Sequence, residues 1–214
     1  MADTIIELPK LEIQRVRIRV IGDSPLIMHK WSDKAKEMMR MKQQKKATQG
    51  REAKDPQRDF EDSIHRLDDG RPGFPAIGFK AAAVTACTSI AGVTKVAARQ
   101  AFHILGDLVP IIGPAPTMRE DMVRIGMGVA DIRYRAEFWP WSADLEISYN
   151  TRALSIEQIM NLLNTAGFGV GVGEWRPERD GQFGRFHCAA DDEIEEVADI
   201  QESQAPKGRR RKAA

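Results

Sequence analysis

The chain has 214 residues, of which 42% are hydrophobic and 29% are charged. This length and composition predict a single domain with a hydrophobic core. Because no run approaches about 18 apolar residues, no membrane-spanning helix is expected, and the N-terminus lacks the pattern of a secretory signal peptide. The two cysteines, Cys87 and Cys188, have neither a disulfide framework nor zinc-ligand spacing. We therefore expect a cytoplasmic protein that has no membrane partner and no metal or other cofactor.

Charge is unevenly distributed along the chain, although the net charge is only +1. Basic residues gather in the segment 34–46, acidic residues in 191–202, and basic residues again in 207–212. The segment 189–214 contains few apolar residues, which predicts a disordered tail that is acidic and then basic. The acidic block is either a solvated linker or a segment that folds back over a basic surface or over the chain's own basic tail.

The first predicted element is a strand at 13–21, where apolar and basic residues alternate. Its polar face carries three arginines: Arg15, Arg17 and Arg19. A row of arginines on an open sheet suits contacts with phosphates and bases. The alternative is pairing with Asp144 and Glu146 of a neighbouring strand. Asp23-Ser24-Pro25 is expected to end or bend the strand.

The segment 29–72 is predicted to be an insertion between the first strand and the first core helix. Residues 32–47 favour a helix, residues 48–58 a loop, and residues 59–67 a second short helix. The first helix carries four basic residues: Lys34, Lys36, Arg40 and Lys42. By composition alone they predict an ordinary solvated helix face.

Small residues predict a helix at 80–90, and a second helix is expected at 93–103. Lys80 begins the first of them, where the helix dipole favours anions, so it is a candidate phosphate contact or a plain surface lysine. Four strands are then expected, at 108–112, 122–129, 132–138 and 143–149. Pro140 separates the last two, which predicts a hairpin. Arg133 and Arg135 are expected on a strand beside the first one.

A capping box at Ser155–Gln158 begins an amphipathic helix, and Gly167 is expected just after its C-terminus. A glycine-rich loop then leads into a last strand at 183–188. With the insertion set aside, the order is strand, helix, strand, strand, helix, strand. This order predicts an α+β fold with a ferredoxin-like, RRM-like core (a split βαβ) and a helical insertion after the first strand.

The most informative stretch of the sequence is 167–188, which contains the glycine-rich loop and the start of the last strand. Glycine lets another backbone approach closely, and arginine matches phosphate oxygens, so this loop is predicted to contact a sugar–phosphate backbone. Its candidate binding residues are Gly169, Gly171, Gly173, Trp175, Arg176, Arg179 and Arg185. The alternative is a tight helix-to-strand connection whose arginines pair with the nearby acids Glu174, Glu178 and Asp180.

Candidate catalytic residues are few. His29 and His65 lie in the insertion, where either is a possible general base for RNA cleavage. The four histidines lack the spacing of zinc ligands, and no phosphate-binding loop or hydrolase nucleophile motif is present. We therefore expect no catalytic residue, with endoribonuclease activity as the alternative.

Three stretches resemble the RAMP superfamily of CRISPR proteins. They are the strand end Gly22-Asp-Ser-Pro-Leu-Ile27, the turn and helix Phe74-Pro-Ala-Ile-Gly-Phe-Lys80-Ala-Ala-Ala-Val84, and the glycine-rich loop with Gly181-Gln-Phe-Gly-Arg-Phe186. They occur in the family's order. The implied division is an N-terminal arm at 1–12, a RAMP-like domain at 13–188 that contains the insertion, and the tail at 189–214.

The sequence departs from the family at Ala76, where glycine is usual, and at the insert Glu174–Pro177. It also resembles phage-encoded proteins with a Gly-Val-Gly-Glu-Trp-Arg-Pro stretch, so a divergent, phage-encoded relative is expected. The resemblance implies non-catalytic binding of single-stranded RNA or DNA by a helical homo-oligomer. In such an assembly, the basic residues of the insertion contact the nucleic acid and the insertion reaches the next subunit. The alternatives are an endoribonuclease of the CRISPR RNA-processing type and a protein-binding module that mimics or inhibits a host nucleic-acid complex.

Overall fold

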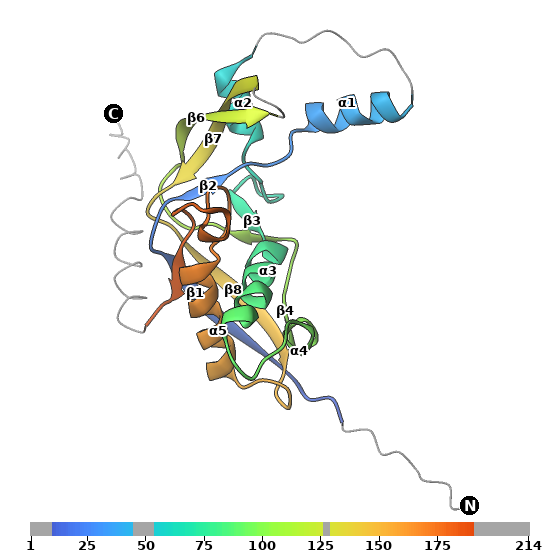
Figure 1. The fold of residues 1–214 in the computed structure, drawn as a ribbon, viewed down its shortest axis with the longest axis vertical. Helices are drawn as coiled ribbons and strands as arrows, with labels where there is room; N and C mark the ends of the chain where they lie inside the picture. The colour runs from blue at the N-terminus through green and yellow to red at the C-terminus, as the bar shows by residue number, and fades with distance from the viewer. Residues whose placement is uncertain (1–9, 45–53, 126–128, 191–214) are drawn as a thin grey trace, which may run out of the picture.

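The computed structural model describes residues 10–44, 54–125 and 129–190, and it confirms the predicted α+β class (Figure 1). The strands are β1 (Ile13–Gly22), β2 (Leu26–Met28), β3 (Gly73–Pro75), β4 (Phe102–Ile104), β5 (Leu108–Pro110), β6 (Thr117–Ile125), β7 (Val129–Phe138), β8 (Ser142–Asn150) and β9 (Phe186–Cys188). The helices are α1 (Asp33–Gln43), α2 (Pro56–Asp62), α3 (Ala76–Ala86), α4 (Lys95–Ala101) and α5 (Ile156–Gly169). The predicted tail at 189–214 lies almost wholly outside the described residues.

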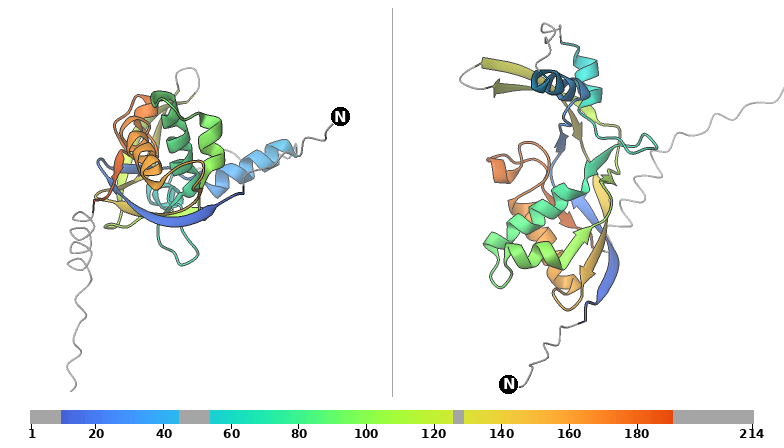
Figure 2. Two further views of the ribbon diagram at one scale, coloured as in Figure 1. Left: turned by 90° about the horizontal axis from the view of Figure 1, so that it is seen from below. Right: turned by 90° about the vertical axis from the view of Figure 1, so that its right-hand side faces the viewer.

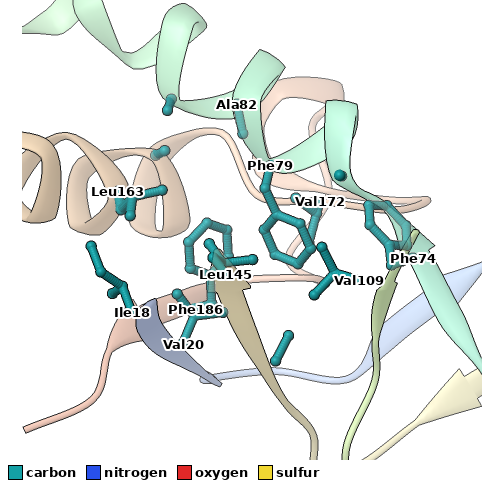
Figure 3. Packing of buried hydrophobic residues seen from close by; sticks show 14 of the residues in the cluster. Ile18, Val20, Phe74, Phe79, Ala82, Val109, Leu145, Leu163, Val172 and Phe186 are labelled. Carbon is teal, nitrogen blue, oxygen red and sulfur yellow. The ribbon is translucent and has the colours of Figure 1, made fainter. Parts of the chain in front are cut away.

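The main sheet has the strand order β4-β8-β1-β9, and every neighbouring pair is antiparallel. Helices α3 and α5 cover one face of it (Figures 1 and 2). The alternation of β1 places Ile18 and Val20 on this face, where they meet Phe79 of α3 and Leu163 of α5 (Figure 3). Burial of these apolar side chains drives the two layers together.

A second sheet, with the order β2-β7-β6, stands at one end of the molecule (Figure 1). The strand β1 ends at Gly22 and the chain resumes as β2 in this second sheet, so the expected bend at Ser24-Pro25 is confirmed. Helix α2 packs on the second sheet, where the backbone N–H of Ala136 donates to Ser63 Oγ at 3.0 Å. Helix α1 projects from the same end of the molecule.

The prediction of a helix at 93–103 is wrong in its last part. Helix α4 ends at Ala101, and residues 102–104 form β4, the edge strand of the main sheet. Phe102 is fully buried and lies opposite Tyr149 of β8. Burial of this aromatic side chain against the sheet outweighs local helix propensity. The strand predicted at 108–112 is β5, which pairs with β3 in a separate two-stranded sheet.

The predicted hairpin around Pro140 is also wrong. Strand β7 pairs with β6 and β2, whereas β8 pairs with β1, so the chain changes sheets between them. Trp141 anchors this change because it is buried and its Nε1 donates to the Ser24 carbonyl at 2.8 Å. Arg133 and Arg135 therefore lie in the second sheet and not beside the arginines of β1.

The capping box at the start of α5 is confirmed, with Ser155 Oγ accepting from the Gln158 backbone at 3.3 Å. Gly167 is not the residue after the helix, since α5 continues to Gly169. A Cβ on Gly167 would lie 1.8 Å from the carbonyl oxygen of Phe186. The absence of a side chain thus lets α5 approach β9 at this position.

We predict that Gly167→Ala destabilises the fold by about 1–3 kcal/mol or more, because β9 must move away from α5. Gly169→Ala is the matched control: it lies in the same helical turn, and a Cβ there meets nothing within 4 Å. Urea unfolding of both variants measures the difference. Equal stabilities of the two variants would contradict the close approach.

Candidate nucleic-acid interface

A cleft of about 440 Å³ lies between α3 and the glycine-rich loop. Its wall brings together side chains that are far apart in the sequence. The ionisable ones are His29, His65, Glu174, Arg176, Glu178 and Arg179. Gly171 and Gly173 line the same cleft and contribute backbone only. The cleft therefore combines two guanidinium groups, two carboxylates, two imidazoles and bare peptide groups. Its size suits a nucleotide-sized ligand.

The glycine-rich loop is held against β2 by backbone hydrogen bonds. The N–H of Glu174 donates to the Ile27 carbonyl at 3.0 Å, and that of Gly184 donates to the Pro25 carbonyl at 2.8 Å. Gly173 has a φ of +79°, and a Cβ there would lie 2.5 Å from the Ile27 carbonyl oxygen. The loop therefore needs glycine at this position in order to contact β2, independently of any ligand.

The alternative interpretation, in which the loop arginines pair with nearby acids, is correct for Arg176. Its Nη2 lies 2.7 Å from Glu178 Oε2, and its Nη1 donates to the Gly173 carbonyl at 3.0 Å. Arg179 is exposed and, within the described part of the chain, forms no ion pair. Arg176 therefore stabilises the loop through contacts within it, and Arg179 is the arginine of the cleft that is available to a ligand.

Three other candidates of the loop lie apart from the cleft wall. Gly169 ends α5 at an exposed position. Trp175 is 41% exposed and has a φ of +53°, a conformation that is unfavourable for a bulky residue. Its carbonyl accepts from the Phe183 N–H at 3.0 Å. Arg185 uses its Nε to donate to the Gln182 carbonyl at 3.3 Å.

The surroundings of both cleft histidines disfavour the protonated imidazole. Burial lowers the pKa of His65, and Lys30 and Lys36 lower it further. Loss of solvation is also the main cause that lowers the pKa of His29; Arg135 lowers it further, whereas Glu174 partly opposes the change. Both imidazoles are therefore neutral at pH 7. Among the described side chains of the basic helix, Lys36 is therefore close enough to His65 to affect its pKa.

The other described basic residues of α1 lie further along this helix, which projects from the body of the molecule (Figure 1). Arg40 lies 3.7 Å from Glu37 on the same helix, and Lys42 is exposed. The side chain of Lys34 lies outside the described residues.

On the main sheet, the predicted arginine row faces a row of acids. Arg19 pairs with Asp144 at 2.6 and 2.9 Å, and Arg17 pairs with Glu146 at 2.7 Å. Arg15 is exposed and has no ion-pair partner among the residues described. The cross-strand alternative therefore accounts for two of the three arginines, and this face has little unbalanced positive charge.

Lys80 lies one turn inside α3, because the helix begins at Ala76 and not at Lys80. Its Nζ contacts His103 Nδ1 at 2.9 Å and donates to the Arg99 carbonyl at 3.1 Å. This ammonium group therefore points toward α4 and β4, and it is not in the position of a helix N-terminal anion site.

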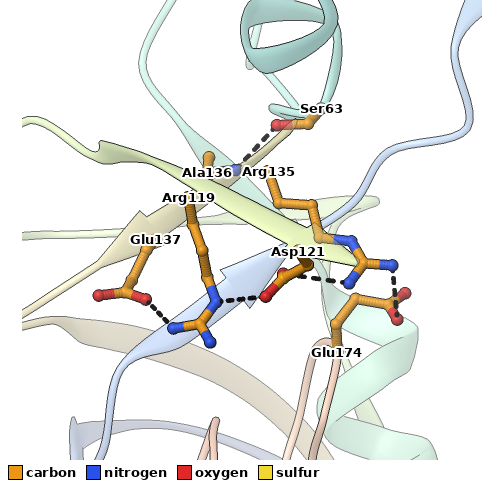
Figure 4. Close-up of polar contacts among 7 residues, drawn as sticks. All are labelled: Ser63, Arg119, Asp121, Arg135, Ala136, Glu137 and Glu174. Carbon is orange, nitrogen blue, oxygen red and sulfur yellow. Dashed lines mark hydrogen bonds and ion pairs between the residues drawn. The ribbon is translucent and has the colours of Figure 1, made fainter. Parts of the chain in front are cut away.

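A buried charge network, which was not predicted from the sequence, borders the cleft (Figure 4). Arg135 of β7 is only 5% exposed, and its Nη1 lies 3.2 Å from Asp121 Oδ2 of β6. Its Nη2 lies 3.8 Å from Glu174 of the loop. Arg119 bridges Asp121 at 2.8 Å and Glu137 at 2.7 Å. The network thus links the second sheet to the glycine-rich loop, and only the alternation of charges in 117–138 hints at it.

A larger cavity, of about 930 Å³, lies elsewhere and contains none of the predicted binding residues. Its wall is mainly apolar and rich in proline, and the ionisable residues in it are Glu61, Arg66 and Arg71. Arg66 pairs with Glu61 and Arg71 pairs with Asp69, so these charges are already matched.

Comparisons with known proteins find no family model and no curated protein that matches the chain. The solved structures include a similar one, the crystal structure of Cmr6 from Pyrococcus furiosus, at a TM-score of 0.44 and 10% sequence identity. The match covers 84% of this chain and 100% of that chain. Within the described ranges, no helix is long and apolar enough to cross a membrane.

We predict that Asp121→Asn destabilises the protein by about 3–5 kcal/mol, because it leaves the Arg135 guanidinium buried without its nearest carboxylate. Glu174→Gln should cost about 1 kcal/mol or less, since Glu174 is 43% exposed and more distant from Arg135. Denaturant unfolding compares the two. If both substitutions lowered the free energy of unfolding by the same small amount, the buried Arg135–Asp121 pair would not be the main stabilising contact of this region.

Proposed function

We propose that the chain binds single-stranded nucleic acid without cleaving it, through the cleft beside the glycine-rich loop, as a divergent member of the RAMP superfamily. The single observation that carries this proposal is the cleft itself, which gathers Arg176, Arg179 and two histidines around bare glycine backbone. Phosphate oxygens match guanidinium groups and peptide N–H groups. A sugar–phosphate backbone is therefore the ligand whose chemistry the cleft fits best.

The proposed core is ferredoxin-like. Its six elements are β1, α3, β4, β8, α5 and β9, and the sheet order β4-β8-β1-β9 is the order of a split βαβ fold when the strands are numbered 2-3-1-4. The open face of such a sheet is often the binding platform in RRM-like proteins. Here this face carries paired arginines and acids, which favours the cleft on the helical side over the open sheet.

Binding requires a rearrangement of charges at one arginine. Arg179 can contact a phosphate directly, whereas Arg176 must exchange Glu178 for the ligand. Lys36 near His65 and the exposed Lys42 extend the positive surface onto α1. Together with the RAMP resemblance, this arrangement supports a strand that passes from the cleft to the insertion, with several copies of the chain along it.

We predict that Arg179→Ala weakens binding of fluorescent single-stranded RNA or DNA and lowers the slope of log affinity against log salt by about one. The fold should be unaffected because Arg179 is exposed. Arg152→Ala is the matched control. It removes an exposed arginine before the start of α5, roughly 20 Å from the cleft along the helix axis. If both variants bound equally, the cleft would not be the interface.

In the same titration, Glu178→Gln should change the affinity in the opposite direction. This substitution frees the Arg176 guanidinium from its carboxylate partner, so the variant should bind more tightly than the wild type.

Parallel titrations with single-stranded RNA, single-stranded DNA and duplex DNA identify the preferred nucleic acid. No binding of any of them at low salt would contradict the proposal and favour a protein partner.

A second candidate function is metal-free RNA cleavage, and the observation that favours it is the presence of His29 and His65 in one cleft. In such a reaction one imidazole takes the proton of the 2′-hydroxyl, which attacks the phosphorus. The other imidazole donates a proton to the departing 5′-oxygen, and a 2′,3′-cyclic phosphate forms. The two roles need one neutral and one protonated ring.

For this candidate we predict an optimum below about pH 6.5, because both pKa values are lowered from that of a free histidine. His29→Ala and His65→Ala should each abolish cleavage of labelled RNA in the presence of a chelator. His103→Ala, which removes an exposed histidine outside the cleft, should leave it unchanged. An intact RNA substrate after incubation with the wild type, from pH 5 to 8, would exclude this candidate.

A further inference from the structure

Strand β6 is an open edge of the second sheet. In the order β2-β7-β6 it pairs only with β7, along all nine of its residues, and the described part of the chain places no strand on its other side. In Figures 1 and 2 the β6–β7 hairpin stands out from the body, near α2. An edge of this length with exposed apolar side chains is a template for pairing with another strand.

The side chains on one face of β6 follow a self-complementary order. Along this face the exposed residues are Met118, Glu120, Met122 and Arg124. Met122 is 69% exposed, and its neighbour on β7, Ile132, is 41% exposed. Glu120 and Arg124 are equally far from Met122, on opposite sides, and neither forms an ion pair with a described residue. The strand therefore carries an acid and a base placed symmetrically about an apolar centre.

We propose that β6 pairs antiparallel with β6 of a second copy of this chain, about a two-fold axis that passes beside Met122. In this register Met122 lies opposite Met122 of the partner subunit, and Glu120 lies opposite Arg124 of the partner subunit. The two-fold axis forms this ion pair twice. The unpaired edge groups of both strands gain partners, and two three-stranded sheets become one of six strands.

The charges select this register over its neighbours. If the axis passed beside Glu120 or Arg124, two like charges would lie directly opposite each other, which is unfavourable. If it passed beside Asp121 or Val123, each charge would face a methionine or leave the described strand, and no ion pair would form. Centring on Met122 is the arrangement in which Glu120 and Arg124 both find opposite charges and the flexible methionines pack together.

The opposite face of β6 is compatible with this pairing. Arg119 and Asp121 point to that face, where they belong to the network with Arg135 and Glu137. They therefore need no partner from the second copy. In the proposed register Asp121 lies opposite Val123 of the partner subunit, which brings no like charge close to the network.

The contact is small, because it consists of two strands and a few side chains. Interfaces below roughly 1,000 Å² of total buried area are generally weak or transient, so dimerisation should depend strongly on protein concentration. The interface is isologous and closes at two copies. It also involves none of the cleft residues, so it does not depend on the proposed nucleic-acid binding.

The test is sedimentation velocity of the full-length protein, freed of nucleic acid by nuclease and salt, from low micromolar to submillimolar concentration. The wild type should convert from monomer to dimer. Glu120→Arg and Arg124→Glu should each weaken dimerisation at least tenfold, since each places like charges opposite each other. The double exchange Glu120→Arg/Arg124→Glu should restore it, because the pairs re-form with their signs reversed.

Mixing the two single variants gives a further readout that only an intermolecular contact can produce. The Glu120→Arg chain then presents two bases and the Arg124→Glu chain two acids, so the mixture should dimerise more tightly than either variant does alone. Glu146→Arg on β8 is the control, because it makes the same charge change at an exposed glutamate of the other sheet. The proposal would be overturned if the wild type stayed monomeric, or if the charge exchanges left the dissociation constant of the dimer unchanged.

Discussion

The buried guanidinium of Arg135 is the constraint on which the arrangement around the cleft depends. A cation that is 5% exposed must be paired, and its two partners come from different parts of the chain. Asp121 belongs to the neighbouring strand of the hairpin, whereas Glu174 belongs to the glycine-rich loop. The pairing therefore fixes the loop relative to the second sheet. Because the backbone of the loop also bonds to β2, the cleft has a wall that is set before any ligand binds.

The arginines differ in what they can offer to a ligand, and the difference arises from their neighbours in space. Arg17, Arg19 and Arg176 have carboxylate partners, whereas Arg179 and Arg15 have none among the described residues. A partner two positions away, such as Glu178 beside Arg176, can be seen in the sequence. Asp144 beside Arg19 could be named only as an alternative, because the strand pairing that joins them spans 125 positions.

The same distinction separates the elements that could be predicted from those that could not. The alternation in β1 and the capping box at Ser155 are local patterns, and the structure has both. Strand β4 and the change of sheet after β7 depend on distant partners. The partner of β4 is β8, and the change of sheet follows from the pairing of β7 with β2 and of β8 with β1. The role of Gly167 likewise depends on the carbonyl of Phe186, which only the folded chain brings near. Local propensity carries no information about such contacts.

The cleft and the β6 edge have a geometric relation that bears on assembly. Directly opposite residues in an antiparallel pair lie on the same face, so a two-fold β6 pair puts the loop-bearing faces of both copies on one side of the joined sheet. The two clefts would then run in opposite directions. A single nucleic-acid strand that passed straight through both clefts would run 5′ to 3′ in one and 3′ to 5′ in the other. The two antiparallel arms of a nucleic-acid hairpin, or two separate strands, can occupy both clefts with the same polarity. Growth of several copies along one strand must therefore use surfaces other than β6, and the two modes of association do not compete for the same residues.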